Sequence, residues 1–163
     1  RAAGGRALAL DGLAAVSGFI FLAVALSGIA ANVLKFAIGR ARPKLLDQAG
    51  IYGLSPFSLE QAYQSLPSGH TTTLFAVAAA LGCFAPRWRV LLYALALLLA
   101  ASRTAVGAHY PSDLVAGAMV AIGCVLLLRR SLARRGLVFQ ELPSGRIVPK
   151  PSVAALMAAL RRS

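Results

Sequence analysis

Four long runs of apolar residues constrain the fold of this chain more than any other feature of its sequence. They cover about residues 12–38, 69–86, 89–108 and 111–129. The first run is long enough to cross a bilayer as a helix, which takes about 20 residues. The second and the fourth are shorter and, taken singly, are also compatible with buried helices. Because Gly, Ala and Ser, which allow close helix packing in lipid, are scattered through the runs, we expect an all-α, integral membrane bundle of four spans.

The composition and the placement of charge agree with a membrane protein. Hydrophobic residues make up 58% of the 163 residues and charged residues only 13%, against about 45–50% and about 25% in soluble globular proteins. The formal net charge of +12 does not indicate a nucleic-acid partner, because the cations lie at the edges of apolar runs and aromatic residues are too few to stack on bases. Cys83 and Cys124 lie inside apolar runs and lack the spacing of a zinc site.

The distribution of Lys and Arg predicts how the spans are oriented. The positive-inside rule makes one side of the alternating spans cytoplasmic, the side that carries Arg1, Arg6, Arg87, Arg89, Arg129, Arg130, Arg134 and Arg135. The loop 43–67 and the segment 104–113 then face outward. We expect residues 1–130 to form the membrane domain and residues 131–163 to form a basic cytoplasmic tail that rests on anionic lipid. In this tail the LPSG run at 142–145 predicts a turn, and residues 153–162 predict a short amphipathic helix that ends in Arg161 and Arg162.

Five cations lie on the outward side, against the rule: Lys35, Arg40, Arg42, Lys44 and Arg103. Cations near the end of a span often only snorkel to the interface, but an anionic ligand would also explain them. On a helix that continues until Pro43, the side chains of Lys35 and Arg42 would point the same way, about 10 Å apart along the axis. Arg40 and Lys44 are expected at the solvated interface, with a second phosphate or lipid headgroups as the alternative.

The run PSGH at 67–70 predicts the start of a helix. Ser68 is a natural N-cap, and Gly69 and His70 then occupy the first helical positions. Backbone N–H groups and the positive end of the helix favour an anion at such a place, and Gly allows an oxyanion to approach closely. A capped turn without chemistry is the plain alternative.

The segment SRTAVGAHYPSD at 102–113 places the second histidine just ahead of the fourth run. Pro111 fits the first turn of that helix, and Asp113 in the same turn can reach one imidazole nitrogen of His109, which would fix the tautomer and stabilise the imidazolium. A lone His–Asp pair is more often structural. Both histidines of the chain, however, lie on the outward side with the five cations. A phosphate pocket explains this convergence by one cause. The cations neutralise the phosphate oxygens and the helix ends donate to them, while one imidazole attacks phosphorus and the other protonates the leaving oxygen.

Together the patterns K-x6-R-P (35–43), P-S-G-H (67–70) and S-R-x5-H-x3-D (102–113) resemble the three-part signature of the type 2 phosphatidic acid phosphatase family, at all eleven fixed positions and in the right order. The resemblance implies that His109 is the nucleophile that forms a phosphohistidine, that Asp113 orients it, and that His70 is the general acid. It implies that the phosphoryl oxygens are held by Lys35, Arg42, Ser68, Gly69 and Arg103. It also implies catalysis without a metal or another cofactor, in agreement with the local excess of cations.

The chain departs from the family pattern in the number of its spans, and the resemblance does not identify the substrate. Membrane members of that family usually have six spans, with the motifs on the last four. Either two N-terminal spans are absent from this chain, as Arg1 in place of Met suggests, or the chain is a minimal version. We expect a phosphatase that acts on a phospholipid or isoprenoid lipid phosphate or pyrophosphate at the outer face of a bacterial cytoplasmic membrane. Undecaprenyl pyrophosphate, phosphatidylglycerophosphate, phosphatidic acid and lipid A all fit the family.

Two other functions are compatible with parts of the same pattern. Vanadate-dependent haloperoxidases resemble the same phosphate pocket, but they are soluble, and the four apolar runs argue against them. A lipid-binding or transport protein would be favoured by an altered motif histidine, and neither His70 nor His109 is altered. The sequence gives no indication of the oligomeric state.

Overall fold

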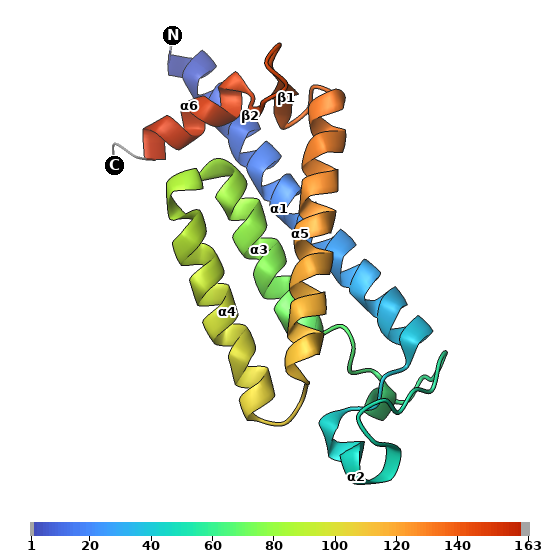
Figure 1. The fold of residues 1–163 in the computed structure, drawn as a ribbon. Coiled ribbons are helices and arrows are strands. Elements are labelled where there is room, and N and C mark those ends of the chain that lie inside the picture. Colours follow the sequence, from blue (N-terminus) through green and yellow to red (C-terminus); the bar gives the residue numbers. More distant parts are fainter. Residues whose placement is uncertain (1, 161–163) are drawn as a thin grey trace. The chain divides into compact units, whose positions relative to one another are not determined.

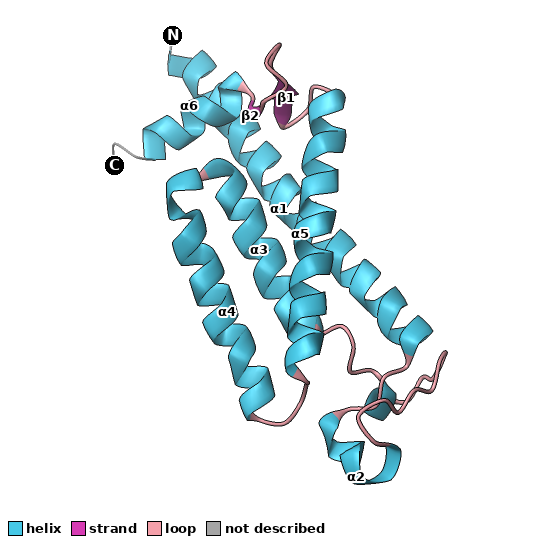
Figure 2. Cartoon of the chain, in the orientation of Figure 1, coloured by secondary structure: helices cyan, strands magenta, loops and turns pink. Residues whose placement is uncertain are grey.

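The computed structural model describes residues 2–160, with side chains described for residues 10–159. Arg1, Arg161 and Arg162 of the expected cytoplasmic side therefore lie outside the described residues. The helices are α1 (Ala2–Ile38), α2 (Leu46–Ala49), α3 (Gly69–Phe84), α4 (Arg89–Ala105), α5 (Pro111–Arg134) and α6 (Pro151–Leu160) (Figure 1). Two short strands, β1 (Phe139–Glu141) and β2 (Ile147–Pro149), and three 3-10 turns, Pro43–Leu45, Gln61–Tyr63 and Pro86–Trp88, complete the described structure. Figure 2 shows how strongly helix predominates.

Within the described residues, three helical segments are long and apolar enough to cross a membrane. These are Leu10–Ile38, Pro86–Ala105 and Pro111–Arg134, with mean hydropathies of 2.3, 1.3 and 2.0. The expected class, an all-α membrane bundle, is therefore confirmed. The helix α3 is apolar but has only 16 residues, or about 24 Å of helix, against a hydrocarbon core of about 30 Å. It ends at Phe84 because the residue before a proline is disfavoured in the α conformation, and Ala85 accordingly leaves the helix with φ −125° and ψ 67°.

The chain divides into two compact units, residues 23–125 and residues 1–22 together with 126–163. In the second unit the tail packs on the N-terminal part of α1. The rings of Phe19 and Phe139 meet edge to face with centroids 4.9 Å apart, and both side chains and that of Val153 are buried. Burial of an aromatic side chain is strongly favourable. The tail therefore has a protein contact of its own, in addition to the lipid contact that its charge predicts.

The tail also confirms the predicted turn and, approximately, the predicted helix. The second LPSG run closes an antiparallel hairpin in which Phe139 pairs with Pro149, and the N–H of Gly145 donates to the carbonyl of Leu142 at 2.8 Å. The helix α6 begins at Pro151 rather than at residue 153, since proline is well suited to the first turn of a helix.

In the unit 23–125, the end of α1 differs from the prediction. The helix stops at Ile38, not at Pro43, and Gly39 adopts a positive φ of 62° while its N–H caps the carbonyl of Lys35 at 2.9 Å. This left-handed conformation is the usual way for glycine to end a helix. Lys35 and Arg42 therefore do not lie on one continuing helix. Arg42 is placed instead by an extended segment, whose N–H at Arg42 donates to the carbonyl of Ala62 at 2.8 Å.

The start of α3 is held against the start of α5. The N–H of Ser68 donates to the backbone carbonyl of Asp113 at 2.9 Å. Gly117 allows this approach, because a Cβ at that position would lie 2.7 Å from the carbonyl oxygen of Ser68. Two of the three sequence motifs, PSGH and S-R-x5-H-x3-D, are thereby joined through their backbones.

Candidate functional site

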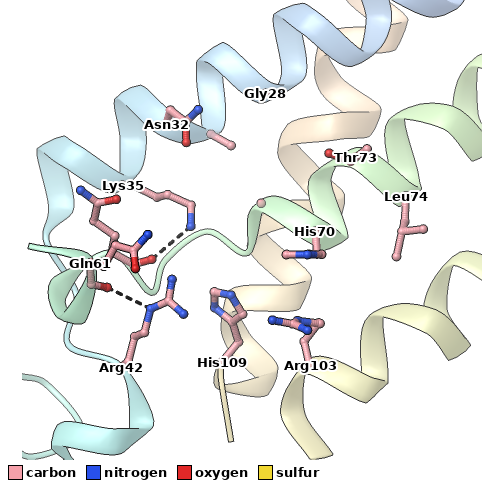
Figure 3. Close-up of a pocket in the computed structure, with 13 residues that line it drawn as sticks. Gly28, Asn32, Lys35, Arg42, Gln61, His70, Thr73, Leu74, Arg103 and His109 are labelled. Carbon is pink, nitrogen blue, oxygen red and sulfur yellow. Dashed lines mark hydrogen bonds between the residues drawn. The ribbon is translucent and has the colours of Figure 1, made fainter. Parts of the chain in front are cut away.

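A cavity of about 570 Å³ lies in the unit 23–125 and brings the three motifs together (Figure 3). All predicted site residues line it except Ser68 and Asp113. The wall is formed by Gly28, Ala31, Asn32, Lys35, Arg42, Gln61, Gln64, Gly69, His70, Thr73, Leu74, Arg103 and His109. Figure 3 shows the imidazoles of His70 and His109 and the guanidinium groups of Arg42 and Arg103 turned towards one another.

Lys35 and Arg42 supply two of the positive charges on the wall. Lys35 lies in the last turn of α1, and its Nζ donates to the carbonyl of Gln64 at 3.1 Å. The Nε of Arg42 donates to the carbonyl of Gln61 at 3.0 Å. Backbone carbonyls orient these cations but do not neutralise them. Both charges therefore stay available for an anion, although Arg42 comes from an extended segment and not, as the sequence predicts, from the helix that carries Lys35.

The N-terminus of α3 provides backbone donors at the same place. Ser68 is the N-cap, as predicted, and its Oγ accepts a hydrogen bond from the N–H of Thr71 at 3.5 Å. The first N–H groups of the helix, at Gly69 and His70, have no acceptor within a helix. Gly69 lies close to the Lys35 side chain, since a Cβ on Gly69 would be 3.9 Å from Nζ. Ser68 itself is buried beneath the wall, and its contact with a phosphate oxygen stays a prediction.

Arg103 and His70 form the opposite part of the wall. Arg103 lies in the last turn of α4, and its Nε is buried without a hydrogen-bond partner among the described residues. A buried donor without a partner is costly. Arg103 lines the cavity, so its guanidinium charge is available to a ligand oxygen there. Ser102, the neighbouring motif residue, is exposed, and its Oγ donates to the carbonyl of Leu99 at 2.6 Å. Ser102 therefore has a local role in the helix.

His109 and Asp113 lie together at the end of the cavity, as predicted. His109 is 3% exposed, and its Nδ1 is 3.5 Å from Oδ2 of the fully buried Asp113. This distance is longer than a good hydrogen bond, but catalytic hydrogen bonds are often long in free enzymes and shorten when substrate binds. Oδ2 of Asp113 also accepts hydrogen bonds from Ser65 Oγ at 2.6 Å and from the N–H of Tyr110 at 2.9 Å. Because Nδ1 faces the carboxylate, Nε2 of His109 is the nitrogen left for the cavity.

Arg40, which the sequence predicts at the solvated interface, is instead part of this group of residues. Its Nη1 donates to Asp113 Oδ1 at 2.8 Å and to Ser112 Oγ at 2.7 Å, and its guanidinium lies 4.3 Å from the centre of the Tyr110 ring. The prediction was wrong because the helix ends at Gly39, which turns Arg40 inward. Lys44, in contrast, is exposed and does not line the cavity, in agreement with the prediction.

The arrangement is suited to a phosphoryl group. Three cationic side chains and a helix N-terminus surround a space that also receives two imidazoles, so negative oxygens can be neutralised while one ring attacks and the other transfers a proton. The residues that line the cavity include no carboxylate. Within the described residues, no three His, Cys, Asp or Glu side chains are grouped in a way that could hold a metal ion.

Comparison with known proteins gives the same family. Residues 17–137 match the PAP2 superfamily. The chain is 44% identical over 130 residues to a lipid A 1-phosphatase of Rhizobium johnstonii and, to the same degree, to one of Rhizobium etli. The alignments cover 80% of this chain but 53% and 56% of the two relatives, so the chain spans about half the length of the curated relatives it matches. No solved structure matches the chain. The matched range contains all three motifs and the whole cavity, and the chain belongs to the PAP2 superfamily.

Proposed function

We propose that this chain carries a membrane lipid phosphatase that cleaves a phosphate monoester or pyrophosphate end through a phosphohistidine intermediate. The observation that supports this most directly is the convergence of both histidines of the chain with Lys35, Arg42 and Arg103 on one cavity. Membership in the PAP2 superfamily and the similarity to two lipid A 1-phosphatases support the same reaction class.

The proposed reaction has two steps. In the first, Nε2 of His109 attacks phosphorus and forms an N–P bond, while the P–O bond to the lipid breaks and His70 gives its proton to the leaving oxygen. In the second, a water molecule attacks the phosphohistidine and gives its proton to His70, and the N–P bond breaks to release phosphate. The cations and the N–H groups at the start of α3 neutralise the three phosphoryl oxygens throughout. No step needs a metal ion.

Asp113 assists without touching the substrate. It does not line the cavity, and its carboxylate lies behind His109. An ionised carboxylate next to Nδ1 holds the ring in one tautomer and stabilises the positive charge that develops when Nε2 bonds to phosphorus.

The substrate and the side of action are parts of the proposal. Both curated relatives are named lipid A 1-phosphatase, and we propose lipid A as the first substrate to test, at the outer face of a bacterial cytoplasmic membrane. The distribution of Lys and Arg supports this side, because Arg87, Arg89 and the cations at 129–135 occupy the opposite ends of the spans. Phosphatidic acid, phosphatidylglycerophosphate and undecaprenyl pyrophosphate form the comparison set.

The test is phosphate release in detergent from these four lipids, by the wild-type chain and by His109→Ala. We expect release that His109→Ala abolishes, and a phosphoryl group on the wild-type protein that is stable in base and labile in acid. Lys35→Met and Lys44→Met form a matched pair, since only Lys35 lines the cavity; only the first should lose most activity. Release by His109→Ala at the wild-type rate would overturn the mechanism.

If the wild-type chain binds these lipids and releases phosphate from none of them, the alternative of a lipid-binding or transport protein takes precedence. Retention of helical circular dichroism and of the elution volume on gel filtration would show that the protein tested is folded.

A further inference from the structure

The wall of the cavity changes in chemistry along its length. On α1, residues 28–35 cover two helical turns, or about 10 Å, from Lys35 past Asn32 to Gly28 and Ala31. On α3 the wall runs in the same direction, from His70 past Thr73 to Leu74 (Figure 3). The cavity is therefore charged at one end, polar and uncharged one turn further along, and apolar beyond that.

Asn32 is an unusual residue for its position. It lies in an apolar segment of a candidate membrane span, between Ala31 and Val33, and its side chain is exposed at the cavity. Among the described residues its amide has no hydrogen-bond partner. An unpaired amide on a cavity wall is available to hydrogen-bond a ligand, and polar residues inside spans usually mark a functional site.

Thr73 faces the cavity in a similar way. Threonine hydroxyls in helices commonly bond to the carbonyl one turn earlier, and the neighbouring Thr72 does so, with Oγ1 2.9 Å from the carbonyl oxygen of Ser68. The Thr73 hydroxyl has no such bond among the described residues and is exposed on the cavity wall. Two helices thus present unpaired polar groups to the cavity, Asn32 three residues before Lys35 on α1 and Thr73 three residues after His70 on α3.

We infer that Asn32 and Thr73 are specificity-determining residues, which hydrogen-bond the group that carries the phosphate and select lipids in which that group bears hydroxyls and amides. This inference rests on the proposed function. Both side chains can donate and accept, as a sugar ring with hydroxyl and amide substituents requires. The small residues Gly28 and Ala31 leave room beside them. No acidic side chain lines the cavity to bind an amine instead.

Other lipid phosphates satisfy these two residues less well. The esters of phosphatidic acid offer acceptors only, and a prenyl chain offers no polar group beyond its phosphates. The glycerol that carries the terminal phosphate of phosphatidylglycerophosphate offers one hydroxyl and no amide. A prenyl substrate would therefore cover Asn32 and Thr73 with hydrocarbon and leave both unpaired. Sites that are built to hydrogen-bond a substrate reject analogues that lack the bonding group, because the buried groups of the site are then left without partners.

The test compares lipid A with undecaprenyl phosphate in the same mixed micelles, for the wild-type chain, Asn32→Leu and Thr73→Val. We expect the wild-type chain to prefer lipid A in kcat/KM. Each substitution should lower the ratio of kcat/KM for lipid A to that for undecaprenyl phosphate by about ten- to a hundredfold, chiefly through the KM for lipid A. Val33→Ala is the matched control on the same helix turn, because Val33 is exposed and does not line the cavity; it should leave the ratio unchanged.

The outcomes separate this inference from the proposed function. If Asn32→Leu and Thr73→Val change kcat/KM for both lipids by the same factor, or if the wild-type chain does not distinguish the two lipids, the specificity role is refuted while the phosphatase activity stands. If the folded wild-type chain hydrolyses neither lipid and none of the comparison set, the proposed function is refuted, and the inference with it.

Discussion

If the proposed mechanism holds, Arg40→Met should slow the reaction, because it removes the charge that is paired with Asp113. The Asp113 carboxylate is 0% exposed and the Arg40 side chain 12% exposed, with 2.8 Å between Nη1 and Oδ1. Methionine keeps most of the length of the side chain and loses the charge and its hydrogen bonds. Oδ1 of Asp113 then lacks its cationic partner, whereas Oδ2 keeps Ser65 and the N–H of Tyr110.

The size of the effect follows from this geometry. A hydrogen bond to a charged group contributes about 1.5–3 kcal/mol, and loss of that amount from the stabilisation of the His109 imidazolium lowers the rate by about 10- to 150-fold. KM should change little, because Arg40 does not line the cavity. Stability should fall as well, since breaking a buried ion pair costs about 3–5 kcal/mol.

The assay is the steady-state and single-turnover release of phosphate by folded protein. Arg40→Lys should recover part of kcat, because it restores the charge but not the fork of donors, and Arg146→Met, at an exposed arginine of the tail hairpin, should behave as wild type. A normal kcat with a raised KM would refute the reasoning, because it would mean that Arg40 contacts the substrate or its headgroup directly.

Three further outcomes are expected. Gly39→Ala should lower Tm by several degrees and reduce activity, because Gly39 has a φ of 62° and a Cβ there would overlap the carbonyl of Ser55; thermal unfolding in detergent measures this. Gly117→Ala should lower kcat even in protein that remains folded, because its Cβ would lie 2.7 Å from the carbonyl oxygen of Ser68 and displace the start of α3. A normal kcat would show that this contact does not position the residues of the site. Excess EDTA should leave phosphate release unchanged, because the lining residues are cations rather than carboxylates, whereas a chelator-sensitive rate restored by Mg²⁺ or Zn²⁺ would contradict a metal-free reaction.

The cations and the two histidines of the cavity wall could be predicted from the sequence, whereas Asn32 and Thr73 on the same wall could not. Cations on the outward side of the spans are costly unless they have a ligand. This cost draws attention to all five outward cations, and the motifs of the family resemblance select Lys35, Arg42 and Arg103 among them. The ends of helices are readable as well: Ser68 and Pro111 begin α3 and α5 as their chemistry predicts. His70 therefore lies in the first turn of α3, and His109 lies just ahead of the first turn of α5.

The support behind that wall could not be predicted in the same way. A run of apolar and small residues followed by Pro43 predicts a helix as far as residue 42, but Gly39 ends it four residues earlier. Gly39 is itself a local signal for the end of a helix, and the prediction, which relied on Pro43, did not use it. The hydrogen bond from the N–H of Ser55 to the carbonyl of Gly39, at 2.7 Å, joins two separate segments, and no local pattern reports such a contact. The ion pair of Arg40 joins residues 73 positions apart in the chain, so it is visible only once the fold is known.

The buried core of the tail was missed for a different reason. Each strand of the hairpin has three residues, which is too short for the alternation of period two to stand out from chance. Phe139 is buried because it meets Phe19 from the other end of the chain. The cationic composition of the tail predicts contact with anionic lipid, which stays a prediction, but composition carries no information about a protein partner such as Phe19.

Asp113 explains why these separate features form one site. Its backbone carbonyl accepts the N–H of Ser68, its Oδ2 accepts Ser65 and lies near His109, and its Oδ1 accepts Arg40. If Arg40 affects catalysis only through this carboxylate, Asp113→Asn and Arg40→Met should not be additive: the double variant should lose about as much kcat as Asp113→Asn alone. Asparagine keeps the backbone carbonyl that holds Ser68. This double-mutant cycle therefore separates the effect of the Asp113 charge from the structural role of its backbone. Additive losses would mean that Arg40 stabilises the reaction independently of Asp113.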